Sequence, residues 1–339
     1  MSTSSSTHSR WNWEARDFAP LISLGVLVVF FACVTREFLS LGTLTLVLQQ
    51  ASVLAIVSVG LTFVLICGEI DLSVGMMALW TACFCGVLFE HPSVAGKGGE
   101  GDPSILLVML VILLPLASSL VLGLASGILT VGSRLPSFII TLAMMNIADG
   151  LARYLTKSEK FSVPGVLKEI GNGEFAVGGG SWTLYVPHSA LLALVVLVIG
   201  HVVLVHTRFG RYVYMTGGNR EATRLAGVRT DRIVVACLAL CAVTAGIGGL
   251  VNAGRLESVS LDQNADLLLS AVACVVLGGT SLFGGEGSML RTVVGVLTFS
   301  VLGVGLIQIQ GIDDLMRPLL MGGVLMVALV INGLLGRRS

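Results

Sequence analysis

Three polar residues interrupt one apolar stretch of the chain. Asn146, Asp149 and Arg153 stand at positions i, i+3 and i+7 of residues 136–156, and on a helix Asp149 and Arg153 form an i,i+4 pair. Ionisable groups are costly inside a membrane and usually face an internal cavity or one another. These side chains can therefore line a polar path or form a structural ion pair between helices, and the residues alone leave both open.

Four more polar side chains fall within apolar stretches and are weaker candidates for lining a path. Hydrogen bonding between helices is the alternative for each, and for any single one it is the favoured interpretation. The four are Gln49, Gln50, Asn252 and Gln308.

Residues 208–232 carry six arginines and two acids in a chain that is otherwise mostly apolar. Within this stretch, G-G-N-R-E-A-T-R-L-A-G predicts a short helix with its own start and stop. Asn219 is the expected N-cap and Gly227 the left-handed residue after the last turn. Glu221 in the first turn and Arg224 in the last turn suit the helix dipole.

The predicted helix has a small apolar face formed by Ala222, Leu225 and Ala226 at i, i+3 and i+4. A helix this short is unstable alone in water, because isolated helices need about 12–15 residues. Either the membrane surface or a groove of a partner protein must hold it. A third interpretation, that the arginines only fix topology, explains the charge but not the caps.

Two glycine-rich junctions each follow an apolar run. V-L-I-C-G-E-I-D-L-S-V-G at 64–75 is echoed by V-V-L-G-G-T-S-L-F-G-G at 275–285, which hints at an internal duplication. Asp71 and Ser73 are expected to cap the helix that follows the first junction. The junction residues of interest are Gly68, Glu69, Asp71, Ser73, Gly75, Gly278, Gly279, Gly284 and Gly285.

Other kinds of chemistry find no support in the sequence. There is no G-x4-G-K-[ST] phosphate loop and no H-E-x-x-H, and the five histidines are scattered. The seven cysteines fall in or beside apolar runs, where they are expected to be small buried side chains. We therefore expect no catalytic residue, cofactor or metal site. A net charge of zero gives no reason to expect nucleic acid as a partner.

The elements that position these residues are membrane-spanning helices. The chain is 55% hydrophobic and 12% charged, with a mean hydropathy of +0.93, which predicts an all-α polytopic membrane protein. About ten apolar segments are long enough to cross, although eight or nine crossings remain possible if the glycine-rich junctions are re-entrant. The segments are 18–35, 45–66, 73–89, 104–130, 136–156, 188–207, 232–252, 266–283, 288–308 and 315–335.

Basic residues indicate the orientation of these segments. With both termini in the cytoplasm, twelve of the twenty basic residues lie inside, including the six arginines of 208–232. This predicts cytoplasmic tails at 1–17 and 336–339 and a single transmembrane domain at 18–335. The loop 157–187 is then the longest one outside the cytoplasm.

Four stretches together resemble one family. H-T-R-F-G-R-Y-V-Y-M-T-G-G-N-R-E-A-T-R-L-A-G-V at 206–228 is similar to the cytoplasmic loop of permease subunits of ABC importers for monosaccharides, of the ribose, xylose and galactose type. G-E-I-D-L-S-V-G at 68–75, R-L-P-S-F-I-I-T-L-A-M-M-N-I-A-D-G-L at 134–151 and V-V-L-G-G-T-S-L-F-G-G-E-G-S at 275–288 also resemble its signatures. The matches occur in family order and span roughly residues 45–335.

The resemblance implies a fold, a function and a set of partners. It implies a homodimeric ten-helix permease of the vitamin B12 importer type (type II) in a bacterial inner membrane. Residues 219–227, including Arg220, would be the coupling helix that docks on a separate ATPase. An extracytoplasmic binding protein would deliver a monosaccharide or related polyol, and Asn146, Asp149 and Arg153 would offer polar groups to its hydroxyls.

Three departures from the family pattern leave substrate and gating contacts open. The family usually has glycine where this chain has Glu69, and it often has arginine where this chain has Asp149. It also often has a Glu-x-Asp pair where this chain has Leu268 and Ser270. Glu69 can also be read as a contact to the ATPase. Two rival functions remain: an ion-coupled secondary transporter, with Asp149 as its coupling carboxylate, and a scaffold or receptor subunit that transports nothing.

Overall fold

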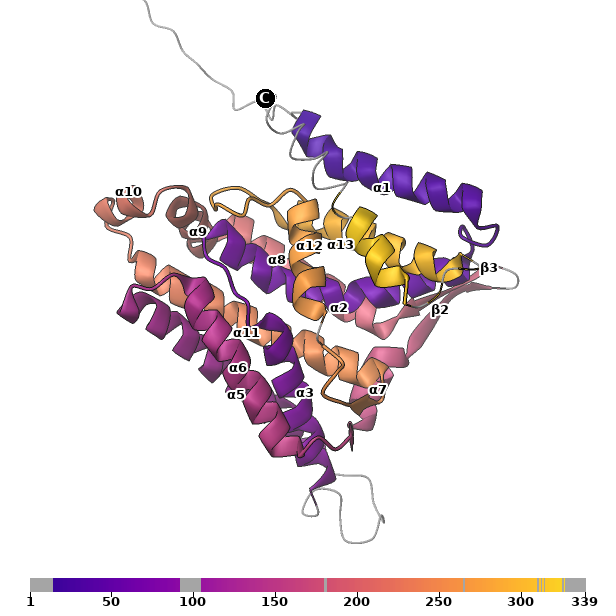
Figure 1. The fold of residues 1–339 in the computed structure, drawn as a ribbon, viewed down its shortest axis with the longest axis horizontal. Helices are drawn as coiled ribbons and strands as arrows, with labels where there is room; N and C mark the ends of the chain where they lie inside the picture. The colour runs from indigo at the N-terminus through magenta and orange to yellow at the C-terminus, as the bar shows by residue number, and fades with distance from the viewer. Residues whose placement is uncertain are drawn as a thin grey trace, which may run out of the picture.

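Helices make up most of the described chain, and their bounds follow the apolar segments expected from the sequence (Figure 1). The computed structural model describes residues 15–91, 105–179, 182–264, 266–309, 311, 313, 315–324 and 326. The long helices are α1 (Ala15–Val34), α2 (Leu41–Ile66), α3 (Val74–Glu90), α5 (Ile105–Ser133), α6 (Ser137–Thr156), α8 (His188–His206), α11 (Thr230–Arg255) and α13 (Met289–Gln308). The shorter ones are α7 (Gly165–Asn172), α9 (Arg208–Gly218), α10 (Arg220–Leu225) and α12 (Leu267–Leu277).

Two small antiparallel sheets accompany the helices. β1 (Phe161–Ser162) pairs with β4 (Ser258–Val259), and β2 (Glu174–Gly179) forms a hairpin with β3 (Trp182–Pro187). The segment 157–187, which the sequence presents as a long loop, is therefore ordered for most of its length as β1, α7 and the hairpin. Polar residues such as Thr45 of α2, whose hydroxyl donates to Tyr185 O at 2.7 Å, anchor the hairpin to the bundle.

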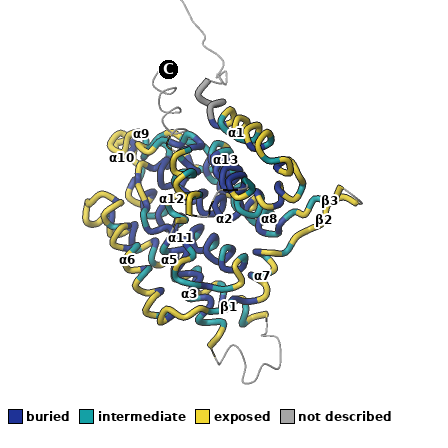
Figure 2. Tube along the Cα trace, turned by 45° about the vertical axis from the view of Figure 1, so that its right-hand side comes forward, coloured by how far each residue is buried: buried dark blue, intermediate teal, exposed yellow. Residues whose placement is uncertain are grey.

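The core of the protein forms around α2 and α11. These two helices pack against each other, and α11 also packs against α5 and α3. Figure 2 shows both as mostly buried, with the exposed residues on the surrounding helices. The largest buried side chains include Phe63 of α2 and Leu238 of α11. The seven cysteine thiols are free and six of them are buried, as small apolar side chains should be.

Among the described residues, six helices are long and apolar enough to cross a membrane: α2, α5, α6, α8, α11 and α13. Residues Pro20–Val34, α3 and α12 form shorter apolar helices. The chain is thus an all-α polytopic membrane protein, but a count of ten crossings is not established. Within the predicted segment 315–335, residues 315 and 316 form a turn and residues 317–324 and 326 are helical, and residues 325 and 327–335 lie outside the described part of the chain.

The eighth predicted segment, 266–283, is wrong in extent. α12 ends at Leu277 after 11 residues, so the helix alone covers roughly 16 Å, about half of a hydrocarbon layer of about 30 Å. Gly278 and Gly279 follow it, and Gly279 has a φ of +88°, a backbone conformation that ends a helix. Residues 278–288 form a turn that leads into α13, which begins where Ser288 Oγ accepts from Arg291 N at 3.2 Å.

The chain gathers its functional segments at one end of the bundle. The end of α2, the start of α6, the α9–α10 segment and the turn 278–288 contact one another there. The opposite end brings together Glu90, β1, α7, the end of α11 and β4. Polar and glycine-rich junctions that are far apart in sequence therefore meet at the same end of the molecule.

Candidate functional site

α10 begins and ends as its sequence predicts. Asn219 Oδ1 accepts a hydrogen bond from the backbone N–H of Ala222 at 2.9 Å, which is the expected N-cap. Glu221 lies in the first turn and Arg224 in the last. Gly227 has a φ of +85° and its N–H donates to Arg224 O at 3.0 Å, so it is the left-handed residue that closes the helix.

The apolar face of α10 points away from the rest of the chain. Ala222, Leu225 and Ala226 are all exposed, and Leu225 is 83% exposed. Figure 1 shows α10 at the edge of the molecule, beside α9 and beyond the ends of the long helices. An exposed apolar face on a short projecting helix favours contact with a partner.

The opposite face of α10 is held by the chain itself. Thr223 is buried, and its hydroxyl lies 2.7 Å from both Met215 O and Asn219 O at the end of α9. The backbone N–H of Val228 donates to Thr223 O at 3.3 Å. The helix is therefore stabilised by local contacts before any partner binds, which sequence reasoning did not foresee.

An ion pair joins α10 to the α2–α3 junction. Arg220 Nη1 lies 2.9 Å from Glu69 Oε1, and only 10% of the Glu69 side chain is exposed. Arg220 Nη2 also lies 3.4 Å from Asp231 Oδ1 at the start of α11. The sequence left open a contact between Glu69 and the ATPase, whereas the structure buries this carboxylate against Arg220 of the same chain. The sequence feature that could have indicated this ion pair is a charged residue at a position where the resembled family usually has glycine.

The junction of residues 67–73 runs along the first turns of α6. Ile70 N donates to Ser137 Oγ at 2.9 Å, and Leu72 N donates to Thr141 Oγ1 at 3.0 Å. Ser137 and Thr141 are both buried. The segment forms no helix or strand of its own and is fixed to α6 by these bonds, and Ser73 and Val74 at the start of α3 are buried.

The predicted cap of α3 by Asp71 and Ser73 is wrong in detail. The Ser73 side chain makes no capping hydrogen bond to the helix. Instead, Asp71 Oδ1 accepts from Ser73 N at 2.8 Å and from Ser73 Oγ at 2.6 Å. The pair closes a tight turn before α3, because an aspartate side chain readily bonds the backbone two residues further on. Gly75 follows in the first turn and lies beside Leu268 of α12.

The second junction packs backbone to backbone against the first. Gly285 N donates to Ile66 O at 2.9 Å. Gly217 near the end of α9 lies so close that a Cβ there would overlap the same carbonyl oxygen, and a Cβ on Gly284 would lie 2.7 Å from the Cα of Gly68. The positive φ of Gly68, Gly284 and Gly285 makes glycine the natural residue at these turns. Glycines of both junctions therefore meet against the end of α9, which leads into α10.

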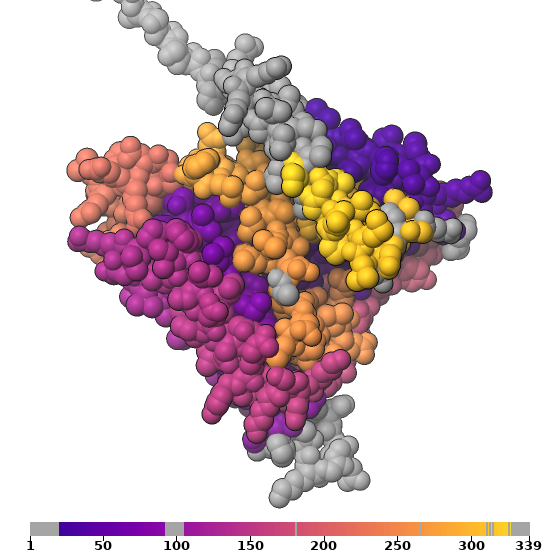
Figure 3. Space-filling model, in the orientation of Figure 1, coloured from indigo at the N-terminus to yellow at the C-terminus, as the bar shows by residue number. Residues whose placement is uncertain are grey.

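The polar residues of α6 lie on the face that the single chain leaves uncovered. Arg153 Nε donates to both oxygens of Asp149, at 3.0 and 2.9 Å, and Asn146 is exposed and its amide donates to Leu142 O of the same helix. Figure 3 shows α6 in magenta on one side of the orange segment that contains α12, with the yellow C-terminal residues on the other. The three predicted residues thus line one face of α6 as expected.

The other path candidates hydrogen-bond or pack against neighbouring elements. Gln49 Nε2 donates to Gly171 O at 3.4 Å, and Gln308 Nε2 donates to Thr43 Oγ1 at 2.8 Å. Asn252 Nδ2 donates to Asn264 Oδ1 at 2.9 Å. The Gln50 amide lies against Gly303 of α13. These contacts are those of side chains that bond neighbouring elements, and among the described residues none of these contacts reaches the polar face of α6.

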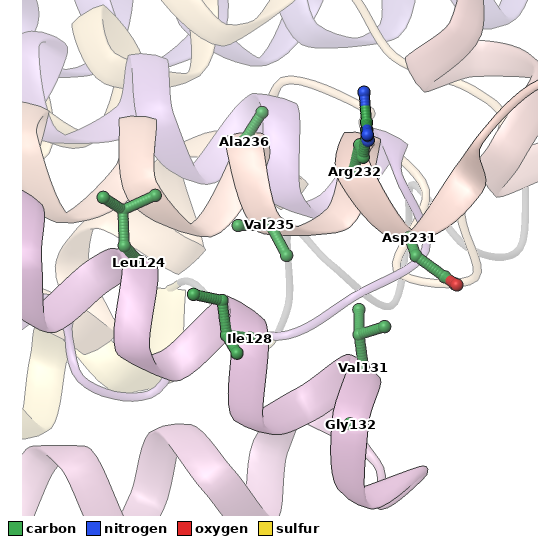
Figure 4. Close-up of a pocket in the computed structure, with 8 residues that line it drawn as sticks. All are labelled: Leu124, Ile128, Val131, Gly132, Asp231, Arg232, Val235 and Ala236. Atoms are coloured by element: carbon green, nitrogen blue, oxygen red, sulfur yellow. The ribbon is translucent and has the colours of Figure 1, made fainter.

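A groove between α5 and α11 contains none of the predicted path residues. Its volume is about 500 Å³, and Figure 4 shows α5 side chains facing Val235 of α11 across it. Its lining is apolar apart from two charged residues at the start of α11, so it offers few partners to a polar solute. It is lined by Leu124, Ile128, Val131, Gly132, Asp231, Arg232, Val235 and Ala236.

Comparison with known proteins settles the family. Residues 43–329 match the family described as branched-chain amino acid transport system / permease component. The chain belongs to this permease family. It is 31% identical over 316 residues to the ribose import permease protein RbsC of Escherichia coli K12, covering 92% of each chain. It is 30% identical over 320 residues to the fructose import permease protein FrcC of Rhizobium meliloti, covering 92% of this chain and 84% of that one.

The permease match spans the segments that form the candidate site. Both glycine-rich junctions, α6 and α10 fall within residues 43–329. RbsC of Bacillus subtilis strain 168 matches at 31% identity over 314 residues, 92% of this chain and 91% of that protein. No solved structure matches the chain significantly. As a permease component, the chain is a transport protein rather than an enzyme.

Proposed function

We propose that this chain is the membrane-spanning subunit of an ATP-driven ABC importer that carries a monosaccharide or related small polyol into the cytoplasm. The observation that carries the proposal is α10, a capped helix whose apolar residues face outward while its other face is fixed to α9 and the α2–α3 junction. Relatives that cover nine-tenths of the chain are named for ribose and fructose import.

We propose that a separate ATPase subunit binds to α10. Ala222, Leu225 and Ala226 offer the apolar surface, and Arg224 and Glu221 flank it with charge. Movement of the ATPase would push α10, and the buried contacts beneath it would pass that movement to the helices. This places residues 208–232 and both termini on the cytoplasmic side, in a bacterial inner membrane.

The sugar path is proposed to form between two copies of the chain. Asn146, Asp149 and Arg153 are available on the uncovered face of α6, and a second copy would enclose them. Carboxylate, amide and guanidinium groups bond hydroxyls well. Ten crossings with the vitamin B12 importer (type II) arrangement, in a single domain at 18–335, remain part of this proposal.

An extracytoplasmic binding protein is proposed to dock near the β2–β3 hairpin. The pairing of Phe175 with Val186 and of Val177 with Leu184 places four apolar side chains on one sheet face. Trp182, which pairs with Gly179, extends this face and is 77% exposed. Aromatic side chains of this kind are common anchors at protein interfaces.

Reconstitution of the chain with its ATPase and binding protein in proteoliposomes tests the proposal. We expect ATP-dependent uptake of ribose or fructose. Ala222→Arg should abolish uptake because it puts a charge on the docking face, whereas Ala222→Ser should preserve it. Uptake that Ala222→Arg leaves unchanged would show that α10 does not couple the two subunits.

The same experiment separates the rival functions. Uptake driven by a proton or sodium gradient without the ATPase would indicate a secondary transporter. ATPase binding with no uptake of any sugar would indicate a scaffold. The structure gives the first rival no added support, because Asp149 is held by both of its oxygens to Arg153.

A further inference from the structure

We infer that Glu69 is a positioning residue that ties α10 to α6 through the α2–α3 junction. The inference rests on the proposed role of α10 as the helix that receives movement from the ATPase. It adds a route by which that movement reaches the polar face of α6.

The first step of the route is the ion pair between α10 and the junction. Glu69 Oε1 lies 2.9 Å from Arg220 Nη1, with the carboxylate buried and the guanidinium half exposed. Arg220 is the first residue of α10, so the bond holds the helix at its N-terminal end. A buried carboxylate that loses its cation is strongly destabilised, and the two groups are therefore expected to move together.

The second step fixes the junction to α6. One residue after Glu69, Ile70 N donates to Ser137 Oγ at 2.9 Å, and Ile70 O accepts from Thr141 Oγ1 at 3.3 Å. Leu72 N donates to Thr141 Oγ1 at 3.0 Å. Residues 69–73 of the junction belong to no helix or strand, so no helical hydrogen bonds within them absorb a displacement. A shift of Glu69 is consequently passed to the first turns of α6.

The third step is α6 itself. Ser137 and Thr141 lie in the same 20-residue helix as Asn146, Asp149 and Arg153. A helix moves largely as a rigid element, because each turn is bonded to the next. Tilting its first turns therefore repositions the polar face about two turns further on.

A neighbouring carboxylate provides a matched control. Asp231 also contacts Arg220, but at 3.4 Å and with 63% of its side chain exposed. Exposed ion pairs contribute little, and Asp231 belongs to α11 rather than to the junction. Removing its charge leaves the route through Glu69 intact. Glycine, the usual residue of the resembling motif at position 69, offers no such bond.

Hydrogen exchange on the purified chain in lipid nanodiscs tests the link without any partner. Glu69→Gln keeps the size of the side chain and removes its charge. We expect faster exchange both in residues 219–227 and in residues 137–141, and little change in Asp231→Asn. Faster exchange in 219–227 alone would overturn the route to α6.

Coupled transport tests whether the link is used. In proteoliposomes with the ATPase and binding protein, we expect Glu69→Gln to lower ribose or fructose uptake per ATP about fivefold or more, while basal ATP hydrolysis and ATPase binding persist. The charge-exchanged pair Glu69→Arg with Arg220→Glu should recover part of the loss. This ratio is a quantity that a purely structural role would not change.

The outcomes separate the two proposals. If wild-type chain neither binds nor stimulates the ATPase, the proposed function fails. If the ATPase binds and Glu69→Gln retains wild-type uptake per ATP, the function stands and the role of Glu69 is refuted. Should Glu69→Gln unfold, Glu69→Gly serves as the second variant, with the same fall in uptake per ATP expected.

Discussion

The carbonyl oxygen of Ile66 accepts a hydrogen bond from Gly285 N at 2.9 Å, and it occupies the space that a side chain on Gly217 would need. The last turn of α2, the turn 278–288 and the end of α9 are thus in contact through backbone atoms. Since α10 follows α9 directly, the position of the exposed helix depends on this contact.

Gly217→Ala is therefore expected to destabilise the protein. The added methyl must displace the backbone of α2 or of the turn, and overpacking of this kind costs about 1–3 kcal/mol. Gly218→Ala is the matched control, because a Cβ there meets nothing within 4 Å. Thermal unfolding of the purified variants in detergent measures the difference. Equal midpoints for the two would contradict the close contact.

The cap of α10 gives a second prediction. Asn219→Ala removes the side-chain acceptor of the Ala222 N–H, and the loss of an N-cap costs about 1 kcal/mol. Because α10 has only six residues, we expect this cost to appear as faster hydrogen exchange in 220–225 and weaker ATPase binding. Asn219→Asp retains an acceptor and should behave like wild type. Similar exchange in all three proteins would rule out a role for the cap.

A pH dependence is expected from Tyr214 of α9. Its hydroxyl donates to Gly287 O at 2.7 Å, and burial raises the pKa of the phenol above its ordinary value of 10.0, although Arg291 opposes this rise. The folded state therefore keeps its proton when the unfolded state has lost it. Stability from this group is complete below pH 10 and is lost as the pH rises through the higher folded pKa.

Tyr214→Phe tests that sign. At neutral pH the variant should lose about 1 kcal/mol, the contribution of one hydrogen bond. Above pH 10 its unfolding midpoint should fall less steeply than that of wild type. Parallel pH profiles measured by thermal unfolding would show that the Tyr214 proton does not contribute.

Local signals explain how far the sequence could predict this structure. The caps of α10 depend on Asn219 and Gly227, which act within a few residues, and both were predictable. The predicted segment 266–283 ran too far because Leu282 and Phe283 resume the apolar pattern soon after α12 ends at Leu277. The pair of glycines at 278 and 279 was the better indicator.

Long-range pairing was beyond the sequence. Glu69 and Arg220 are 151 positions apart, and periodicity gives no information about contacts at that distance. The contact of Ile70 and Leu72 with α6 was hidden for another reason: both donors are backbone N–H groups, which every sequence contains. What the sequence did show is a carboxylate at a junction of apolar residues, and such a group requires a partner.

The Asp149–Arg153 pair provides the prediction that decides between its two interpretations. On the single chain the pair is exposed, with the side chains 31% and 55% accessible, so Asp149→Asn should leave the unfolding midpoint in detergent nearly unchanged. If the pair lines the sugar path, the same variant should lower ribose or fructose uptake at least about tenfold while ATPase binding persists. The reason is that a site built to hydrogen-bond a sugar hydroxyl works far less well when the group that bonds this hydroxyl is changed. A purely structural pair predicts the reverse: a lower midpoint with uptake per folded complex retained. Asp262→Asn is the control, because Asp262 is a second acidic residue whose charge acts on Arg153. Measuring the unfolding midpoint and the sugar uptake of both variants therefore shows whether the pair lines the path or stabilises the fold.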